Sequence, residues 1–233
     1  MRQLQRLIIS ENTLGSGQHG DLNFLCSLTN STSLQNLQIG RNNFGGSIPQ
    51  CIGNLSITLM LLAIPHNYIL GSLPNDIGNL INLEILALWG NHMFGHISST
   101  LGNLNKLHEL ELQQNELPRK IPQSFGNLSM LIYLRLNNNH LDGSIPSSLG
   151  KLENLQSLDL SDNNFSGFIP SELIGFSSLS IYLDLSQNNL SSSIPKEVGN
   201  LKYIIKLHLD SNWLFGEIPS SIAKYTSMEY LYL

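Results

Sequence analysis

The chain has 233 residues, of which 41% are hydrophobic and 12% are charged, and its formal net charge at pH 7 is −5. Lys and Arg do not cluster along any segment, so the electrostatic attraction that dominates nucleic-acid binding is missing, and we exclude DNA and RNA as partners. No run of about 18 apolar residues occurs either, so no direct insertion of this segment into a membrane is expected.

One asparagine returns in the same frame along the whole chain. Successive positions are 24 or 25 residues apart, except for a first interval of 30. The positions are Asn12, Asn42, Asn67, Asn91, Asn115, Asn139, Asn163, Asn188 and Asn212. Around them recurs Leu-x-x-Leu-x-Leu-x-x-Asn-x-Leu-x-Gly-x-Ile-Pro, as from Leu131 to Pro146. This period predicts a single leucine-rich repeat solenoid over residues 1–233, with about nine to ten repeats.

Each repeat predicts the same local structure. Leu-x-Leu alternation indicates a short strand with one buried face, and stacked strands give a parallel sheet on the concave face of an arc. The recurring Asn is expected to bond backbone groups of its own and the adjacent turn, which makes it structural. A short return such as residues 147–152 follows, with Leu149 and Leu152 pointing inward and Gly150 permitting a close turn.

The first repeat carries an insert over residues 15–30, and the spacing of its leucines predicts a short helix over residues 21–28. Cys26 and Cys51 lie in successive repeats. We expect two buried free thiols, with a disulfide as the alternative that the sequence leaves open. Departures from the repeat at Ser98, Arg119 and Ser192 predict local distortion of the turn.

The two ends of the chain do not have the pattern of polar caps. Solenoids need caps because an open end exposes a cross-section of the core. Residues 1–7 already fit inside a repeat, and residues 231–233 stop within a strand pattern. We therefore expect an internal segment of a longer protein, or a truncated gene product, without N- or C-terminal caps.

Two patterns imitate functional motifs. Residues 15–20 match Gly-x-Gly-x-x-Gly, but the strand and helix that would build a nucleotide site around them are not expected here. His92 and His96 are four apart, yet they flank a turn and lack a third ligand of suitable spacing. With no serine in a nucleophile-elbow context either, we expect no enzyme activity, no cofactor and no metal.

The Leu-x-Gly-x-Ile-Pro half with its 24-residue period is similar to the plant-specific class of leucine-rich repeats in ectodomains of receptor-like kinases and receptor-like proteins. Residues 20–30, 43–49 and 52–56 resemble the receptor-kinase subfamily that includes sensors of bacterial flagellin and elongation factor. The resemblance implies the ligand-recognition segment of a larger serine/threonine kinase in innate immune signalling, on the extracellular side of the plasma membrane. It further implies a peptide or protein ligand and a co-receptor kinase as partners. The alternative is a kinase-less leucine-rich repeat interaction protein of the receptor-like or inhibitor type, or a truncated gene product.

Candidate contact residues are the exposed strand positions that carry aromatic or charged side chains, the types most often found as interface anchors. A central group consists of Trp89, His108, Glu109, Glu111, Gln113, Tyr133 and Arg135. A second group, nearer the C-terminus, consists of Tyr182, Lys206 and His208 with Tyr230 and Tyr232. Acceptor sequences for N-glycosylation begin at Asn30, Asn54, Asn127, Asn164 and Asn189.

Overall fold

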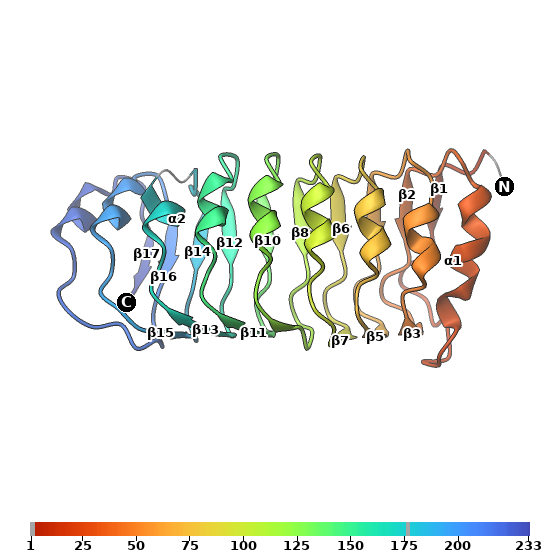
Figure 1. Ribbon diagram of the computed structural model, residues 1–233, viewed down its shortest axis with the longest axis horizontal. Helices are drawn as coiled ribbons and strands as arrows, with labels where there is room; N and C mark the ends of the chain where they lie inside the picture. Colours follow the sequence, from red (N-terminus) through yellow and green to blue (C-terminus); the bar gives the residue numbers. More distant parts are fainter. Residues whose placement is uncertain (1–2, 176–177) are drawn as a thin grey trace.

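The structure is a computed structural model that describes residues 3–175 and 178–233. Met1 and Arg2, which the sequence places inside the first repeat, lie outside the described residues. Figure 1 shows the repeats side by side in one row, with the two termini at opposite ends. The main sheet has ten strands, and every pairing between neighbouring strands is parallel. In sheet order the strands are β1 (Arg6–Ile8), β2 (Asn36–Gln38), β4 (Leu61–Ala63), β6 (Ile85–Ala87), β8 (Glu109–Glu111), β10 (Tyr133–Arg135), β12 (Ser157–Asp159), β14 (Tyr182–Asp184), β16 (Lys206–His208) and β17 (Tyr230–Tyr232).

The register of this sheet follows the leucine frame. Leu110, Leu134 and Leu158 lie opposite one another on β8, β10 and β12, and all three are fully buried. The residues on either side of them face away from the core, because side chains alternate along a strand. The predicted parallel sheet with one buried face is confirmed, and its outer face is a row of stacked strand positions.

Two shorter parallel sheets run along the edge of the solenoid. One contains β3 (Gly45–Ser47), β5 (Tyr68–Gly71) and β7 (His92–Met93). The other contains β9 (Pro118–Arg119), β11 (His140–Gly143), β13 (Asn164–Gly167) and β15 (Asn189–Leu190). These pairings give the backbone after the ladder asparagines from Asn42 to Asn188 hydrogen-bond partners in neighbouring repeats.

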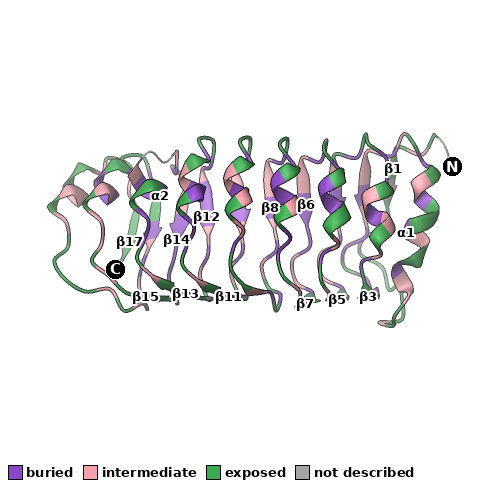
Figure 2. Cartoon of the chain, in the orientation of Figure 1, coloured by how far each residue is buried: buried purple, intermediate pink, exposed green. Residues whose placement is uncertain are grey.

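The return half of most repeats is one helical turn. The turns are η3 (Gln50–Asn54), η4 (Asn75–Asn79), η5 (Ser99–Asn103), η6 (Gln123–Asn127), η7 (Ser147–Lys151), α2 (Ser171–Gly175), η8 (Lys196–Asn200) and η9 (Ser220–Lys224). Leu149 and Leu152 are buried as predicted. A Cβ on Gly150 would lie 2.3 Å from the carbonyl oxygen of Glu172 in the next repeat, so this glycine is needed for close stacking of returns. Figure 2 shows buried residues on strands of the main sheet and, between exposed and intermediate ones, on the helical turns.

The asparagine ladder has the predicted structural role. Asn139 is 6% exposed, and its Nδ2 donates to the carbonyl oxygens of Leu136, Asn137 and, in the preceding repeat, Leu112, at 3.0 to 3.3 Å. Its Oδ1 accepts from the backbone N–H of Leu117 at 3.0 Å. Each interior ladder asparagine thus joins its own repeat to the previous one.

The insert forms the predicted helix, divided into η1 (Asp21–Asn23), α1 (Phe24–Ser27) and η2 (Leu28–Asn30). The prediction of two buried free thiols is wrong, because Cys26 and Cys51 form a disulfide. The insert helix docks beside η3 and brings the two Cα atoms to 5.5 Å, within the range of about 4.4 to 6.8 Å that a disulfide spans. Cys26 is exposed and Cys51 is half-buried, so neither cysteine belongs to the core.

The three departures from the repeat have different outcomes. The predicted distortion at Ser98 is wrong, because the φ of −69° and ψ of 136° at Ser98 are close to the −71° and 130° of Pro146. The Ser98 hydroxyl also accepts a hydrogen bond from the N–H of Thr100. Arg119 takes a φ of 68°, close to the 73° of Gly143, so the turn keeps its shape although an L-residue occupies a left-handed position. In the repeat of Ser192, β15 ends at Leu190 after two residues, but β7 is equally short in a repeat that keeps its glycine, Gly95, so the short strand is not specific to the serine.

Candidate functional site

The concave face gathers four of the central candidate residues into one cluster. Tyr133 lies beside Glu109 and Arg135 beside Glu111 in the register of β8 and β10. The Arg135 guanidinium forms an ion pair with Glu111 and lies 5.6 Å from the centre of the Tyr133 ring. This central cluster presents an aromatic ring, a cation and two carboxylates on adjacent strands.

Asp159 continues this cluster on β12, directly beside Arg135. Its Oδ1 accepts hydrogen bonds from the backbone N–H of Ser161 at 3.1 Å and from the Ser161 hydroxyl at 2.7 Å. Burial raises the pKa of the Asp159 carboxyl, and the neighbouring Asp184 adds to the increase. Asp159 is therefore part of a polar network with fixed partners.

The second predicted group also comes together, around Asp184, which is not among the predicted contact residues. Asp184 is 5% exposed and accepts hydrogen bonds from the hydroxyl groups of Tyr182 and Ser186. His208 Nδ1 lies 3.3 Å from Asp184 Oδ2, and the ring sits edge-on between Tyr182 and Tyr232, with centroid distances of 5.5 and 4.5 Å. Burial raises the pKa of the Tyr182 hydroxyl well above its usual range, and its hydrogen bond to Asp184 adds to this effect.

Lys206 and Tyr230 form a further contact on the same face. The Lys206 Nζ lies 4.9 Å from the centre of the Tyr230 ring, and the two residues are paired in the register of β16 and β17. Lys206 and Tyr230 are one repeat length apart in sequence, and strand neighbours in this sheet are always one repeat apart. The repeat spacing alone would therefore have identified these two residues as neighbours.

The remaining central candidates lie apart from the ion pair. Trp89 packs edge-on against His66, with ring centroids 4.1 Å apart, so His66 is a neighbour that the sequence analysis missed. His108 lines a hollow of about 190 Å³ together with residues of the next two repeats. Gln113 Oε1 is buried and has no hydrogen-bond partner among the residues that the structure describes.

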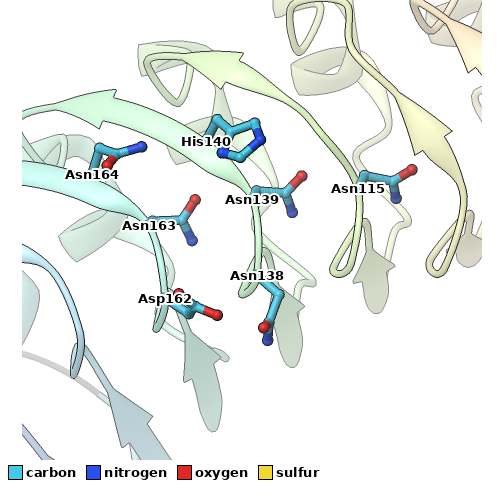
Figure 3. Close-up of a pocket in the computed structure, with 7 residues that line it drawn as sticks. All are labelled: Asn115, Asn138, Asn139, His140, Asp162, Asn163 and Asn164. Carbon is cyan, nitrogen blue, oxygen red and sulfur yellow. The ribbon is translucent and has the colours of Figure 1, made fainter.

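A hollow of about 230 Å³ lies along the edge of the solenoid, and Figure 3 shows the residues that line it. Three of them, Asn115, Asn139 and Asn163, belong to the ladder, and their amide groups already bind backbone carbonyls. We therefore regard this hollow as a by-product of the ladder and place the candidate binding surface on the concave face.

Other predicted features can be located in the structure. All five acceptor asparagines for glycosylation, from Asn30 to Asn189, are exposed. Within the described ranges, no three His, Cys, Asp or Glu side chains lie where they could hold a metal ion. None of the helices in the described part of the chain has the length and apolar character needed to cross a bilayer.

Comparison with protein families identifies the repeat. A leucine rich repeat model matches residues 81–141, a model of leucine rich repeats in two copies matches residues 129–174, and a third leucine rich repeat model matches residues 33–55 and 181–201. Together with the ten-stranded parallel sheet, these matches show that the chain is a leucine-rich repeat solenoid.

Its relatives in sequence are plant receptor kinases. The chain is 51% identical over 81 residues to an Arabidopsis thaliana protein named a probable LRR receptor-like serine/threonine-protein kinase, covering 35% of this chain and 8% of that protein. It is 44% identical over 84 residues to the receptor kinase-like protein Xa21 of Oryza sativa subsp. japonica, covering 36% of this chain and 8% of that protein. The matches thus span a small part of these relatives.

Solved structures extend the similarity to nearly the whole chain. The plant peptide hormone receptor RGFR1, solved in complex with RGF2, gives a TM-score of 0.91 at 34% identity, covering 97% of this chain and 35% of that chain. The Arabidopsis receptor kinase HAESA, solved with the peptide hormone IDA and the co-receptor SERK1, gives 0.75 at 29% identity, covering 100% and 42%. A plant ice-binding protein gives 0.77 at 27% identity, covering 94% and 68%. The chain resembles the ectodomains of plant receptor kinases.

Proposed function

We propose that this chain is the ligand-recognition segment of a plant cell-surface receptor-like serine/threonine kinase, and that its concave face binds a peptide or protein ligand in innate immune signalling. The observation that carries the proposal is the central cluster, where Glu109, Glu111, Tyr133 and Arg135 are half-buried on neighbouring strands. Tyr and Arg are common interface anchors, and a rigid sheet holds them in place. One solved relative is a plant peptide hormone receptor in complex with RGF2, and another is in complex with the peptide hormone IDA, which supports the same class of ligand here.

The same proposal places the chain on the extracellular side of the plasma membrane, as part of a larger receptor with a co-receptor kinase at its side. The HAESA complex with SERK1 supports this arrangement. The exposed acceptor asparagines and the Cys26–Cys51 disulfide suit an oxidising, secretory environment. The alternative is a kinase-less leucine-rich repeat interaction protein or a truncated gene product.

The ligand-binding part is tested by selecting linear peptides from a random displayed library on the folded protein. Replacing Tyr133 and Arg135 together by Ala is expected to lower the affinity for the selected peptides at least about tenfold, because an aromatic and a charged anchor are removed. The matched control is the double replacement of Lys202 and Tyr203 by Ala, which removes a tyrosine and a side chain of the same charge from exposed positions outside the concave strands. Equal losses in the two variants, or no saturable binding to the wild type, would contradict the proposal.

An immunoblot of membrane and soluble fractions from the native source, with and without glycosidase, distinguishes the two readings. A glycosylated membrane band far larger than 25.9 kDa is expected for a receptor kinase. A soluble, unglycosylated band near that mass would support a chain that acts alone.

A further inference from the structure

The N-terminal half of the concave face has an apolar floor that the sequence analysis did not single out. Leu61 lies opposite Ile85, and Ala63 lies opposite Ala87, in the register of β4 and β6. These four side chains form a compact block on two neighbouring strands, about 4.8 Å apart. Met60 extends the block and is 38% exposed. Leu61, Ala63 and Ile85 are half-buried and Ala87 is 6% exposed, and a hollow of about 180 Å³ is lined by Met60, Leu61 and Ile85 among others.

Two carboxylates without partners border this floor. Glu109 lies directly beside Ile85 in the register of β6 and β8, and its backbone N–H donates to the carbonyl oxygen of Glu84 at 3.1 Å. Both glutamates are half-buried. Neither side chain has a hydrogen-bond or ion-pair partner among the residues that the structure describes.

The charge of this region is one-sided. Residues 59–66, 83–90 and 107–114 contain three glutamates and no Lys or Arg, and Lys106, directly before the last of these segments, donates from Nζ to Asn82 Oδ1 at 2.7 Å. Arg135 pairs with Glu111, whereas neither Glu84 nor Glu109 forms an ion pair with any residue that the structure describes. Arg6 and Glu84 line the same hollow, but Arg6 lies on β1, three strands from β6 and four from β8. Arg6 forms no ion pair with either carboxylate.

We infer that this part of the face takes an extended peptide segment that carries an apolar residue and, two positions away, a Lys or Arg. This inference rests on the proposed function and specifies its ligand. The apolar side chain sits on the block formed by Leu61, Ala63, Ile85 and Ala87, and the cation lies between Glu84 and Glu109. In an extended chain, residues two apart point to the same side about 6.6 Å from each other, enough to reach from Ile85 on β6 to Glu109 on the adjacent strand β8, about 4.8 Å away.

The library selection described above tests the inference when its peptides are sequenced and measured against two charge variants. The peptides are expected to share an apolar residue and a basic residue two positions apart. Replacing Glu84 and Glu109 together by Gln should lower the affinity for these peptides about tenfold, and this loss of affinity should be smaller at high salt. The matched control replaces Glu153 and Glu172 by Gln, since both are exposed, lie in the return half and give the same change in net charge.

A separate substitution tests the apolar floor. Ile85→Gln should lower the affinity for the same peptides. Ile81→Gln, at a position 50% exposed in the preceding turn, should leave their affinity unchanged. Circular dichroism and analytical ultracentrifugation of each variant establish that it is folded and whether it self-associates.

Several results would overturn the inference. The selected peptides could instead be neutral or acidic, and their affinity could fall in the Tyr133→Ala, Arg135→Ala variant but not in the glutamate variant. That result would refute the ligand chemistry and leave the proposed function standing. Equal weakening by the Glu153 and Glu172 control would reduce the effect to non-specific attraction. A wild-type dimer that Ile85→Gln abolishes would identify a second copy of this chain as the occupant. Failure of every concave variant to change binding would overturn both proposals.

Discussion

Truncating one ladder asparagine gives the sharpest test of how the solenoid is held together. Asn139→Ala removes three donated hydrogen bonds and one accepted bond from a site that is 6% exposed. The three carbonyl oxygens keep other partners, since those of Leu112 and Leu136 still accept from Asn115 and Asn163, and that of Asn137 accepts from the Gln114 N–H. The N–H of Leu117 has no other acceptor among the described residues.

The expected cost follows from this inventory. Leaving one buried N–H without a partner costs about 2 kcal/mol, and three bonds to carbonyls that retain a partner are worth about 0.5 kcal/mol each, so unfolding should become easier by about 3 to 4 kcal/mol. Asn12 is the matched control, because it is exposed and its Nδ2 reaches only the carbonyls of Ile9 and Ser10, so Asn12→Ala should cost about 1 kcal/mol or less.

The assay is equilibrium unfolding in urea followed by circular dichroism, with hydrogen exchange at the Leu117 amide as the local readout. A ladder that stabilises each junction predicts a clear loss of stability in Asn139→Ala and faster exchange at Leu117. If Asn139→Ala were no less stable than Asn12→Ala, the reasoning about shared backbone bonds would be refuted.

Three further changes probe the N-terminal insert and the edge sheet. Replacing Cys26 and Cys51 by Ser opens a crosslink of sequence separation 25 and should lower the free energy of unfolding by about 3.5 kcal/mol, measured in urea; an unchanged midpoint would contradict this. The Asp21 carboxylate accepts from the backbone N–H of Ser16, which lowers its pKa from 3.8 to about 2, so its stabilising contribution should be present above pH 3.8 and be lost as pH falls through about 2. NMR titration of the Gly45 amide, which donates to Asp21, checks this, and a midpoint near 3.8 would count against it. Arg119→Gly should stabilise the protein by about 0.5 to 1 kcal/mol, because glycine relieves the left-handed strain more than it adds to the entropy of the unfolded chain. A lower urea midpoint for this variant would show that the Arg119 side chain makes a compensating contact.

The regular part of this fold can be predicted from the sequence because every repeat must bury the same leucines and satisfy the same backbone groups. Leu134 and Asn139 each meet the same surroundings one repeat earlier and one repeat later, so a fixed spacing identifies both the core and the ladder. The insert lacks this redundancy. The Cys26–Cys51 disulfide depends on where a helix that occurs once docks against η3, and spacing alone does not determine that contact.

Only part of the candidate surface could be predicted, because contacts between repeats are not visible in the sequence of a single repeat. Tyr133 and Arg135 stand out by residue type, whereas Asp184 and Ala87 are ordinary in sequence and gain significance only from their neighbours. Asp184 holds Tyr182 and His208, and Ala87 completes an apolar block with residues of the previous repeat. Such contacts arise between repeats, so a reading of one repeat at a time misses them.

Photocross-linking maps the proposed ligand directly onto the solenoid. A benzophenone amino acid is introduced at Ile132, which lines the hollow beside His108 next to Tyr133, or at the exposed Tyr203 outside the concave strands, and each protein is irradiated with a peptide selected from the random library. Recognition by the concave face predicts a saturable adduct at position 132 that excess unlabelled peptide suppresses, and none at position 203. An adduct at position 203 with none at position 132 would contradict the account.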